Sequence, residues 1–201
     1  MKELAIFGST GSIGCSTLNV VRRERDRFAV SILTAGHNLQ RLTEQIREFT
    51  PRHVYILEKH DAEALREQFP GLDVYWGAEG MDAISRLTDF DIGVSALVGV
   101  AGLRPTWNMI QNGKTVALAN KEVLVAGGRL VMEAAKECRA TLLTVDSEHS
   151  AIMQCLRGEK HAEIERILLT ASGGPFFEKE ITDDITPEAA LRHPTWKMGP
   201  N

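Results

Sequence analysis

Short apolar runs alternate with amphipathic segments along the first 145 residues of the chain. The apolar runs are hydrophobic on both faces and predict β-strands at residues 4–8, 29–35, 53–57, 73–76, 92–97, 115–119 and 141–145. The segments between them have the apolar spacing of helices, at residues 13–23, 39–49, 61–68, 81–87, 103–112 and 121–138. Strands buried on both faces and separated by helices predict an α/β fold with a doubly wound parallel sheet.

The pattern changes after about residue 150. Residues 151–156 have helical spacing, residues 164–171 alternate as an antiparallel strand would, and the remainder is rich in turn residues, with one short helix after Pro187. We therefore predict one domain at residues 1–149 and the beginning of a second, α+β domain at residues 150–201. The second segment has too little apolar surface for its own core, so we interpret the end at Asn201 as truncation or loss of order.

Composition excludes several classes of protein. The 201 residues are 43% hydrophobic and 25% charged, as in an average globular protein, and the net charge of −4 without a basic block offers no surface for nucleic acid or an anionic membrane. No apolar run approaches the ~20 residues that span a bilayer, and no secretory signal is present, so we expect a soluble, cytoplasmic protein. Cys15, Cys138 and Cys155 have no C-x-x-C spacing, and we expect reduced, buried thiols.

The turn "IFGSTGSIG" places Gly8, Gly11 and Gly14 where the first strand meets the first helix. A pyrophosphate at such a turn needs backbone N–H groups pointing at it and no Cβ in its way, and the helix N-terminus adds a positive end. A plain tight turn would also use glycine. Because the motif opens a repeated βα pattern, we predict that it binds a dinucleotide.

The end of the second strand indicates which dinucleotide. Domains that prefer NAD usually place an acidic residue there for the ribose 2′-hydroxyl, whereas this strand runs into Gly36, His37 and Asn38. The absence of an acid favours NADP. His37 and Arg41 are candidate contacts to its 2′-phosphate, or else solvated loop residues.

Two further polar clusters follow predicted strands. Asn120, Lys121 and Glu122 come after residues 115–119, at the edge of the sheet where ligands of α/β proteins bind. Asn120 could instead cap the next helix, with Glu122 favourably placed in its first turn. Lys121 opposes the helix dipole, which suggests that it meets an anion or a hydroxyl group.

Asp146 and Glu148 follow the last strand of the first domain. In an extended stretch residues i and i+2 face the same side, so the two carboxylates would repel unless a cation lay between them. Mg²⁺ or Mn²⁺ would suit these oxygen ligands. The alternative is that Asp146 or Ser147 caps a helix and Glu148 interacts with its dipole; His149 is expected to be structural.

The remaining candidates lie near the end of the chain. Ser172 precedes Gly173 and Gly174, an arrangement that suits either an anion or a tight turn. His193, Trp196 and Met198 lie on a proline-containing segment that would form either a cover over a ligand or a hydrophobic contact with the sheet.

Five motifs carry a family resemblance: "GSTGSIG", "LANKE", "VDSEHSA", "LTASGGPF" and "HPTWKMG". In this order and spacing they resemble the 1-deoxy-D-xylulose 5-phosphate reductoisomerase family over residues 1–201. The resemblance implies a Rossmann-like NADPH domain, a homodimer, and NADPH with Mg²⁺, Mn²⁺ or Co²⁺ as cofactors. The implied reaction rearranges and reduces a phosphorylated sugar, 1-deoxy-D-xylulose 5-phosphate, to 2-C-methyl-D-erythritol 4-phosphate in isoprenoid biosynthesis.

The resemblance also implies roles for individual residues. NADPH would contact Thr10, Gly11, Ser12, Ile13, Gly36, Asn38, Asn120, Glu122 and Gly199. Asp146 and Glu148 would be two of three carboxylate metal ligands, and the substrate would contact Lys121, Ser147, Ser172 and His193. Trp196 and Met198 would belong to a mobile lid.

The chain departs from the family pattern in two respects. Many members have Lys at the position of His37, and its replacement would weaken recognition of the 2′-phosphate. The family also continues beyond the position of Asn201 with further phosphate contacts, a Glu as third metal ligand and a C-terminal helical domain.

Three functions compete at this stage. The resemblance favours an NADPH- and metal-dependent reductoisomerase. An ordinary NADP-dependent dehydrogenase would not need paired metal carboxylates, and a dinucleotide-binding module without catalysis would suit an incomplete chain.

Overall fold

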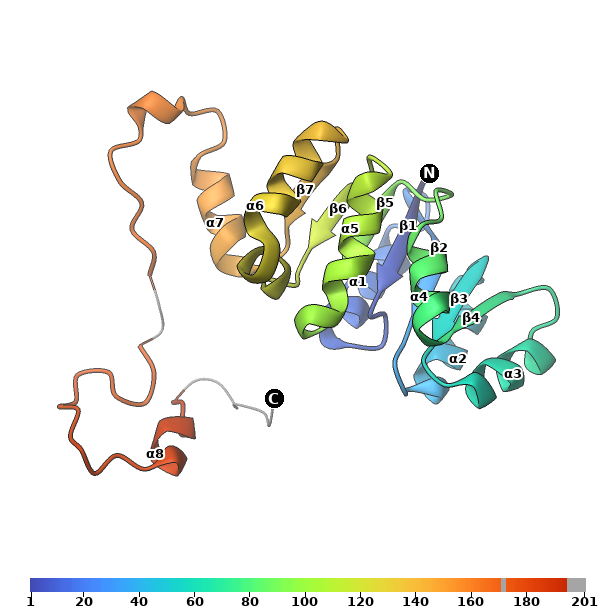
Figure 1. The fold of residues 1–201 in the computed structure, drawn as a ribbon, viewed down its shortest axis with the longest axis horizontal. Helices are drawn as coiled ribbons and strands as arrows, with labels where there is room; N and C mark the ends of the chain where they lie inside the picture. The colour runs from blue at the N-terminus through green and yellow to red at the C-terminus, as the bar shows by residue number, and fades with distance from the viewer. Residues whose placement is uncertain (171–172, 195–201) are drawn as a thin grey trace. The chain divides into compact units, whose positions relative to one another are not determined.

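The computed structural model describes residues 1–170 and 173–194. The chain divides into two units, Met1–Cys155 and Leu156–Asn201. The first unit contains the sheet and nearly all of the helices (Figure 1).

The first unit alternates strands with helices, as the apolar pattern predicts. Its strands are β1 (Lys2–Phe7), β2 (Phe28–Thr34), β3 (His53–Ile56), β4 (Asp73–Trp76), β5 (Ile92–Ser95), β6 (Thr115–Leu118) and β7 (Thr141–Thr144). Its helices are α1 (Ser12–Arg23), α2 (Leu39–Phe49), α3 (Lys59–Gln68), α4 (Gly77–Ser85), α5 (Leu103–Gln111), α6 (Glu122–Glu137) and α7 (Ser147–Cys155), with a short 3₁₀ turn, η1 (Gly99–Gly102). The predicted elements are confirmed, and the clearest differences are an earlier start of α4 and of α7.

The strands form one seven-stranded sheet in the order β4-β3-β2-β1-β5-β6-β7, and every neighbouring pair is parallel. The chain winds outward from β1 in one direction and then, from β5, in the other. This is the doubly wound, Rossmann-like arrangement predicted from the sequence. In folds of this kind, ligands bind in the crevice at the carboxyl ends of the strands where the winding reverses, here β1 and β5.

Alternation along the strands divides the core into two layers. In β1, Leu4 and Ile6 pack in the cluster with buried residues of α1, α2 and α3, whereas Ala5 and Phe7 pack with those of α4, α5 and α6. Figure 1 shows α4, α5 and α6 in front of the sheet and α1 and α2 behind it. Burial of both faces explains why the central strands are continuous apolar runs in the sequence.

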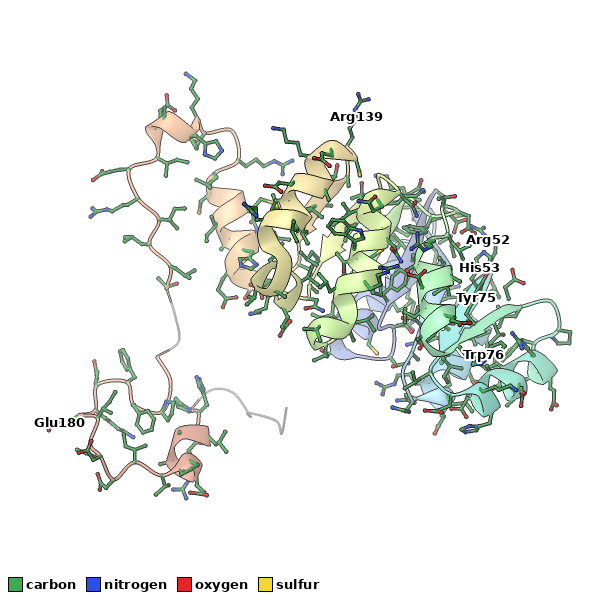
Figure 2. The ribbon with its side chains drawn as sticks, in the orientation of Figure 1. Arg52, His53, Tyr75, Trp76, Arg139 and Glu180 are labelled. Atoms are coloured by element: carbon green, nitrogen blue, oxygen red, sulfur yellow. The ribbon has the colours of Figure 1, made fainter. Side chains whose placement is uncertain are left out.

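Ion pairs join the strands at their amino ends. Arg52 and His53 lie at the start of β3 (Figure 2), where Arg52 Nε donates to Asp89 Oδ2 at 2.9 Å and His53 Nε2 lies 3.0 Å from the same oxygen. Burial opposes ionisation of Asp89, but hydrogen bonds, the largest of them from Arg52, outweigh it and lower the pKa of this carboxyl. These contacts lie at the edge of the sheet opposite to the crevice.

In its described residues, the second unit contains two short helices, η2 (His161–Glu163) and α8 (Pro187–Leu191). The helix after Pro187 is therefore confirmed, whereas the strand predicted for residues 164–171 is wrong for the described residues 164–170. Ile167, Leu168 and Leu169 are largely exposed, and no described strand pairs with them. An alternating pattern yields a strand only where a partner edge supplies hydrogen bonds.

The three cysteines are free thiols, as predicted, but none of them is buried. Cys15 and Cys138 are partly exposed, and Cys155 is exposed on α7, a helix without a buried residue. The prediction of buried thiols is therefore wrong. Within the described residues, no helix has the length and apolar character needed to cross a membrane.

Asp82 joins two helices that cover one face of the sheet. Its carboxylate on α4 accepts hydrogen bonds from Arg86 Nε at 2.8 Å, from Arg104 Nε of α5 at 2.8 Å and from Asn108 Nδ2 of α5 at 3.0 Å. These hydrogen bonds hold the pKa of Asp82 well below its ordinary value, with Arg86 as the largest cause and Arg104 next.

We predict that Asp82→Asn lowers the melting temperature at neutral pH. Because the pKa of Asp82 is lower in the folded than in the unfolded protein, where it is about 3.9, its contribution to stability is present above that pH and is lost as the pH falls through the folded-state pKa. Thermal unfolding followed by circular dichroism should show the difference between wild type and variant narrowing below about pH 4. Asp26→Asn, at an exposed position, is the control; an equal effect at Asp26, or a difference that does not change with pH, would contradict the prediction.

Candidate functional site

The carboxyl ends of four neighbouring strands bring together the polar residues predicted to form a site. In the order of the sheet, β1 leads into Gly8, β5 into Ala96, β6 into Asn120 and β7 into Asp146. Backbone hydrogen bonds join the successive tips: Ala96 N–H donates to Phe7 O, Asn120 N–H to Ser95 O and Val145 N–H to Leu118 O. The tips therefore form one continuous edge.

The glycine turn after β1 is shaped by close backbone contacts. Gly8 has a φ of +93°, and a Cβ there would lie 2.6 Å from the carbonyl oxygen of Ala96. A Cβ on Gly14 would lie 2.3 Å from the carbonyl oxygen of Gly8. Two of the three motif glycines are thus required by packing within the chain itself, whether or not a ligand is bound.

Buried polar contacts hold the turn in place from the side of β2 and α2. Gly8 N–H donates to Thr34 Oγ1 at 2.8 Å, Ser9 Oγ donates to Gln45 Oε1 at 2.7 Å, and Gln45 Nε2 donates to Ser9 O at 2.9 Å. All of these side chains are buried. The sequence analysis missed Thr34 and Gln45. Thr34 is a polar residue at the end of an apolar strand, and Gln45 lies beside the apolar positions Leu42 and Ile46, so both were recognisable.

The first turn of α1 is open to an anion. The helix begins after Gly11, which as the N-cap residue makes no side-chain hydrogen bond to the backbone N–H groups of the first turn. No acidic residue lies in this first turn, so nothing there opposes the positive end of the helix dipole. Thr10, Gly11, Ser12 and Ile13, the predicted pyrophosphate contacts, surround these N–H groups.

The end of β2 lies beside this turn. Asn38 caps α2 by accepting from Arg41 N–H at 3.0 Å, and Arg41 Nη1 donates to Thr10 O at 3.3 Å. His37 is exposed, and its Nδ1 lies 4.0 Å from Glu58 Oε1. The sequence shows no acidic residue at the end of β2. Glu58, which approaches His37, follows the neighbouring strand β3 instead.

Asn120 does not cap α6, contrary to the alternative weighed from the sequence. Helix α6 begins at Glu122, with Lys121 as the N-cap residue and no side-chain capping bond. Asn120 is buried, and its Nδ2 donates to Gly99 O at 2.8 Å. Its Oδ1 is buried without a hydrogen-bond donor among the described residues. A buried, unpaired acceptor at the edge of the crevice is a candidate contact for a bound ligand.

Lys121 meets an anion, the carboxylate of Asp146. Lys121 Nζ lies 2.8 Å from Asp146 Oδ2, which joins the end of β6 to the end of β7. This hydrogen bond is the largest cause of a raised pKa of Lys121 and of a lowered pKa of Asp146, and the mutual attraction of the two charges acts in the same direction. Both groups are therefore held in their charged forms.

Asp146 is also bound to the start of α7. The backbone N–H of His149 contributes to the lowered pKa of this carboxyl, as at an N-cap position, and Oδ1 lies 3.5 Å from His149 Nδ1. Glu148 lies in the first helical turn, where Ser147 Oγ donates to Glu148 Oε2 at 2.8 Å. The expectation that Asp146 and Glu148 share one face of an extended stretch is wrong, because helix formation begins at Ser147 rather than at residue 151.

The oxygen donors fit a hard divalent cation in part. Asp146 already faces a cation, the ammonium group of Lys121, and Glu148 is the next carboxylate along the chain. Within residues 1–170 and 173–194, no group of three or more His, Cys, Asp and Glu side chains is placed to hold a metal ion. Mg²⁺ commonly binds through one or two carboxylates together with water and substrate oxygens, so this pair is a reasonable partial site.

The other predicted site residues are distributed between the two units. Gly36 lies in the segment that follows β2, and Glu122 is the first residue of α6. His193 follows α8 in the second unit and is partly buried; its backbone N–H donates to Leu191 O at 2.9 Å. Ser172, Trp196, Met198 and Gly199 lie outside the described residues.

Comparison with known proteins identifies close relatives. The family model described as 1-deoxy-D-xylulose 5-phosphate reductoisomerase matches residues 4–128, and that of the C-terminal domain of the same enzyme matches residues 142–201. Proteins named 1-deoxy-D-xylulose 5-phosphate reductoisomerase from Chlorobium phaeobacteroides and Thermoanaerobacter pseudethanolicus are 51% and 48% identical, each over 99% of this chain and 53% of the relative. The chain spans about half the length of the curated relatives it matches.

Solved structures of enzymes with the same name also resemble this chain. A DOX-P reductoisomerase in complex with NADPH, fosmidomycin and magnesium is 34% identical with a TM-score of 0.86, over 99% of this chain and 52% of that one. The 1-deoxy-D-xylulose 5-phosphate reductoisomerase from Zymomonas mobilis in complex with NADPH is 38% identical with a TM-score of 0.83, over 89% of this chain and 48% of that one.

We predict that Gly14→Ala destabilises the protein by about 1–3 kcal/mol, because the new methyl group must displace the backbone of Gly8 and Ser9. Gly128→Ala in α6 is the matched control, since a Cβ there meets nothing within 4 Å. The control should leave stability unchanged or raise it by up to about 1 kcal/mol. Urea unfolding of both variants measures the difference, and equal stability of the two would show that the turn is not closely packed.

Proposed function

Because the chain belongs to the 1-deoxy-D-xylulose 5-phosphate reductoisomerase family, we propose that the protein containing it converts 1-deoxy-D-xylulose 5-phosphate to 2-C-methyl-D-erythritol 4-phosphate, using NADPH and a divalent metal ion. One observation carries the proposal. The glycine turn after β1 and the Lys121–Asp146 pair after β6 and β7 lie on the same edge of one sheet, so a dinucleotide in the crevice would extend toward the acidic group.

The proposed dinucleotide site is built from the strand ends around the crevice. Thr10, Gly11, Ser12 and Ile13 would bind the pyrophosphate through the first turn of α1, with Gly36, His37 and Asn38 beside the adenosine end. The unpaired Oδ1 of Asn120 would accept a hydrogen bond from the cofactor. Glu122 and Gly199 complete the set that the family resemblance assigns. NADPH bound there would supply the hydride for the reduction step.

The proposed reaction centre is at the end of β7. Asp146 and Glu148 would bind Mg²⁺, Mn²⁺ or Co²⁺, which when bound supplies Lewis-acid polarisation of the substrate oxygens. Lys121 and Ser147 would contact the substrate, and Lys121 is held in its charged form by Asp146, ready to donate to an oxygen that gains negative charge. Ser172 and His193 would bind the phosphate group, and Trp196 and Met198 would cover the site and exclude water.

The assembly follows from the same proposal. We assign residues 1–149 to the dinucleotide-binding domain and residues 150–201 to part of a catalytic domain with its lid segment. The proposed enzyme is a homodimer in the bacterial cytoplasm. Sedimentation of the purified protein measures its oligomeric state.

A second candidate is an NADPH-binding protein without catalytic activity. One observation favours it: the described residues provide two acidic side chains at the end of β7 but no group of three metal ligands. Tight NADPH binding without turnover of 1-deoxy-D-xylulose 5-phosphate would support this candidate over the first.

We expect NADPH oxidation with 1-deoxy-D-xylulose 5-phosphate to stop when a chelator removes the metal ion and to resume with Mg²⁺ or Mn²⁺. Glu148→Gln should abolish this turnover and leave NADPH affinity nearly unchanged, because Glu148 lies in α7 rather than at the glycine turn. NADPH absorbance measures turnover, and fluorescence titration measures affinity. Oxidation that persists in the chelator would indicate an ordinary dehydrogenase, and an equal loss of NADPH binding in Glu148→Gln would contradict the metal assignment.

We predict that His37→Lys tightens NADPH binding several-fold and leaves NADH binding unchanged. A permanent cation beside the 2′-phosphate would offset the nearby Glu58 carboxylate, whereas NADH has no phosphate at this position. Gln68→Lys, at the exposed last position of α3, adds a permanent cation at the other end of that helix. Fluorescence titration with both nucleotides provides the test; an equal gain for NADH, or the same gain in Gln68→Lys, would place the 2′-phosphate elsewhere.

A further inference from the structure

We infer that Lys121 acts as an internal counter-ion that competes with the divalent metal ion for Asp146, so that the metal site opens fully only when a substrate oxygen draws Lys121 away. This inference rests on the proposed assignment of Asp146 as a metal ligand. It goes beyond that assignment by giving Lys121 a positioning role before any substrate is bound.

The first argument is the use of both carboxylate oxygens of Asp146. Oδ2 lies 2.8 Å from Lys121 Nζ, and Oδ1 lies 3.5 Å from His149 Nδ1. The side chain of Asp146 is only 12% exposed. A metal ion must therefore approach a carboxylate that is largely enclosed and already has a cation as partner.

The second argument is electrostatic. A metal–oxygen bond of about 2.1 Å to Oδ2 would leave the metal ion and the ammonium group less than about 5 Å apart, wherever around the oxygen the ion bound. A dication and an ammonium group at that distance repel each other strongly in the partly enclosed space at the end of β7. Metal binding at Asp146 therefore weakens the Lys121 contact, and the Lys121 contact weakens metal binding.

The third argument is that Lys121 is free to leave. Its side chain is 56% exposed, and Asp146 is its only ion-pair partner within the described residues. At the N-cap position of α6 its charge opposes the helix dipole, so the helix itself does not hold it there. A negatively charged substrate oxygen offers an alternative partner within the reach of this flexible side chain.

These arguments predict coupling between the two ligands. If substrate draws Lys121 from Asp146, substrate strengthens metal binding, and by linkage the metal ion strengthens substrate binding by the same factor. Lys121 would then favour binding of the metal together with substrate over binding of the metal alone.

The test is Mn²⁺ binding to the protein without substrate or nucleotide, measured by the electron paramagnetic resonance signal of free Mn²⁺. Lys121→Met and Lys121→Gln should bind Mn²⁺ on the order of 3–10-fold more tightly than wild type, and Lys121→Arg, which keeps the cation, should bind like wild type. Lys136→Met removes the same charge from the last turn of the same helix and should change little. Circular dichroism checks the fold of each variant.

The outcomes separate this inference from the proposed function. Asp146→Asn should weaken Mn²⁺ binding; if it does not, the metal assignment itself fails. If Asp146→Asn weakens binding but neither Lys121→Met nor Lys121→Gln tightens it, the counter-ion role alone is wrong. An equal gain in Lys136→Met would attribute the effect to net charge and would also overturn the inference.

Discussion

The close approach of the glycine turn to the end of β5 is the constraint on which the rest of the crevice depends. β1 and β5 are neighbours in the sheet, and the chain reverses its winding direction between them. At this point Gly8 packs against the carbonyl group of Ala96 and Gly14 packs against Gly8, with no space for a Cβ at either position. Thr34 and Gln45 hold the same turn from the other side. These contacts fix the path of the chain from β1 into α1. They therefore also fix the position of the open first turn of α1.

This constraint changes how the glycine motif is interpreted. In the sequence, the glycines at residues 8, 11 and 14 indicate space for a pyrophosphate, with a plain tight turn as the alternative. The structure shows that Gly8 and Gly14 are needed by the turn in either case, whereas a Cβ on Gly11 would lie 3.4 Å from its nearest neighbour, an ordinary contact. Packing and ligand binding are therefore compatible explanations of one motif, and the motif alone does not distinguish them.

The sequence predicted local structure well where burial decides it. The central strands are apolar on both faces because helices cover both faces, whereas β7 at the edge of the sheet has no buried residue. The prediction failed at residues 164–170, where alternation without a partner strand produces no ladder, and at the start of α7, which the predicted helix at residues 151–156 places too late. Contacts between residues far apart in the sequence could not be predicted from the apolar pattern. Glu58 approaches His37 from the segment after β3, and Lys121 and Asp146 meet because β6 and β7 are neighbours.

The two explanations of Asp146, a helix cap and a metal ligand, are compatible with each other. The backbone N–H of His149 favours the charged carboxylate at the start of α7, as at an N-cap position. It does not neutralise that charge, and Oδ2 remains directed at a cation, the Lys121 ammonium group. A carboxylate held by a cap loses less conformational freedom when it binds a metal ion than one on a free side chain. Capping thus prepares Asp146 for a cation, and Lys121 is the cation that this chain itself supplies.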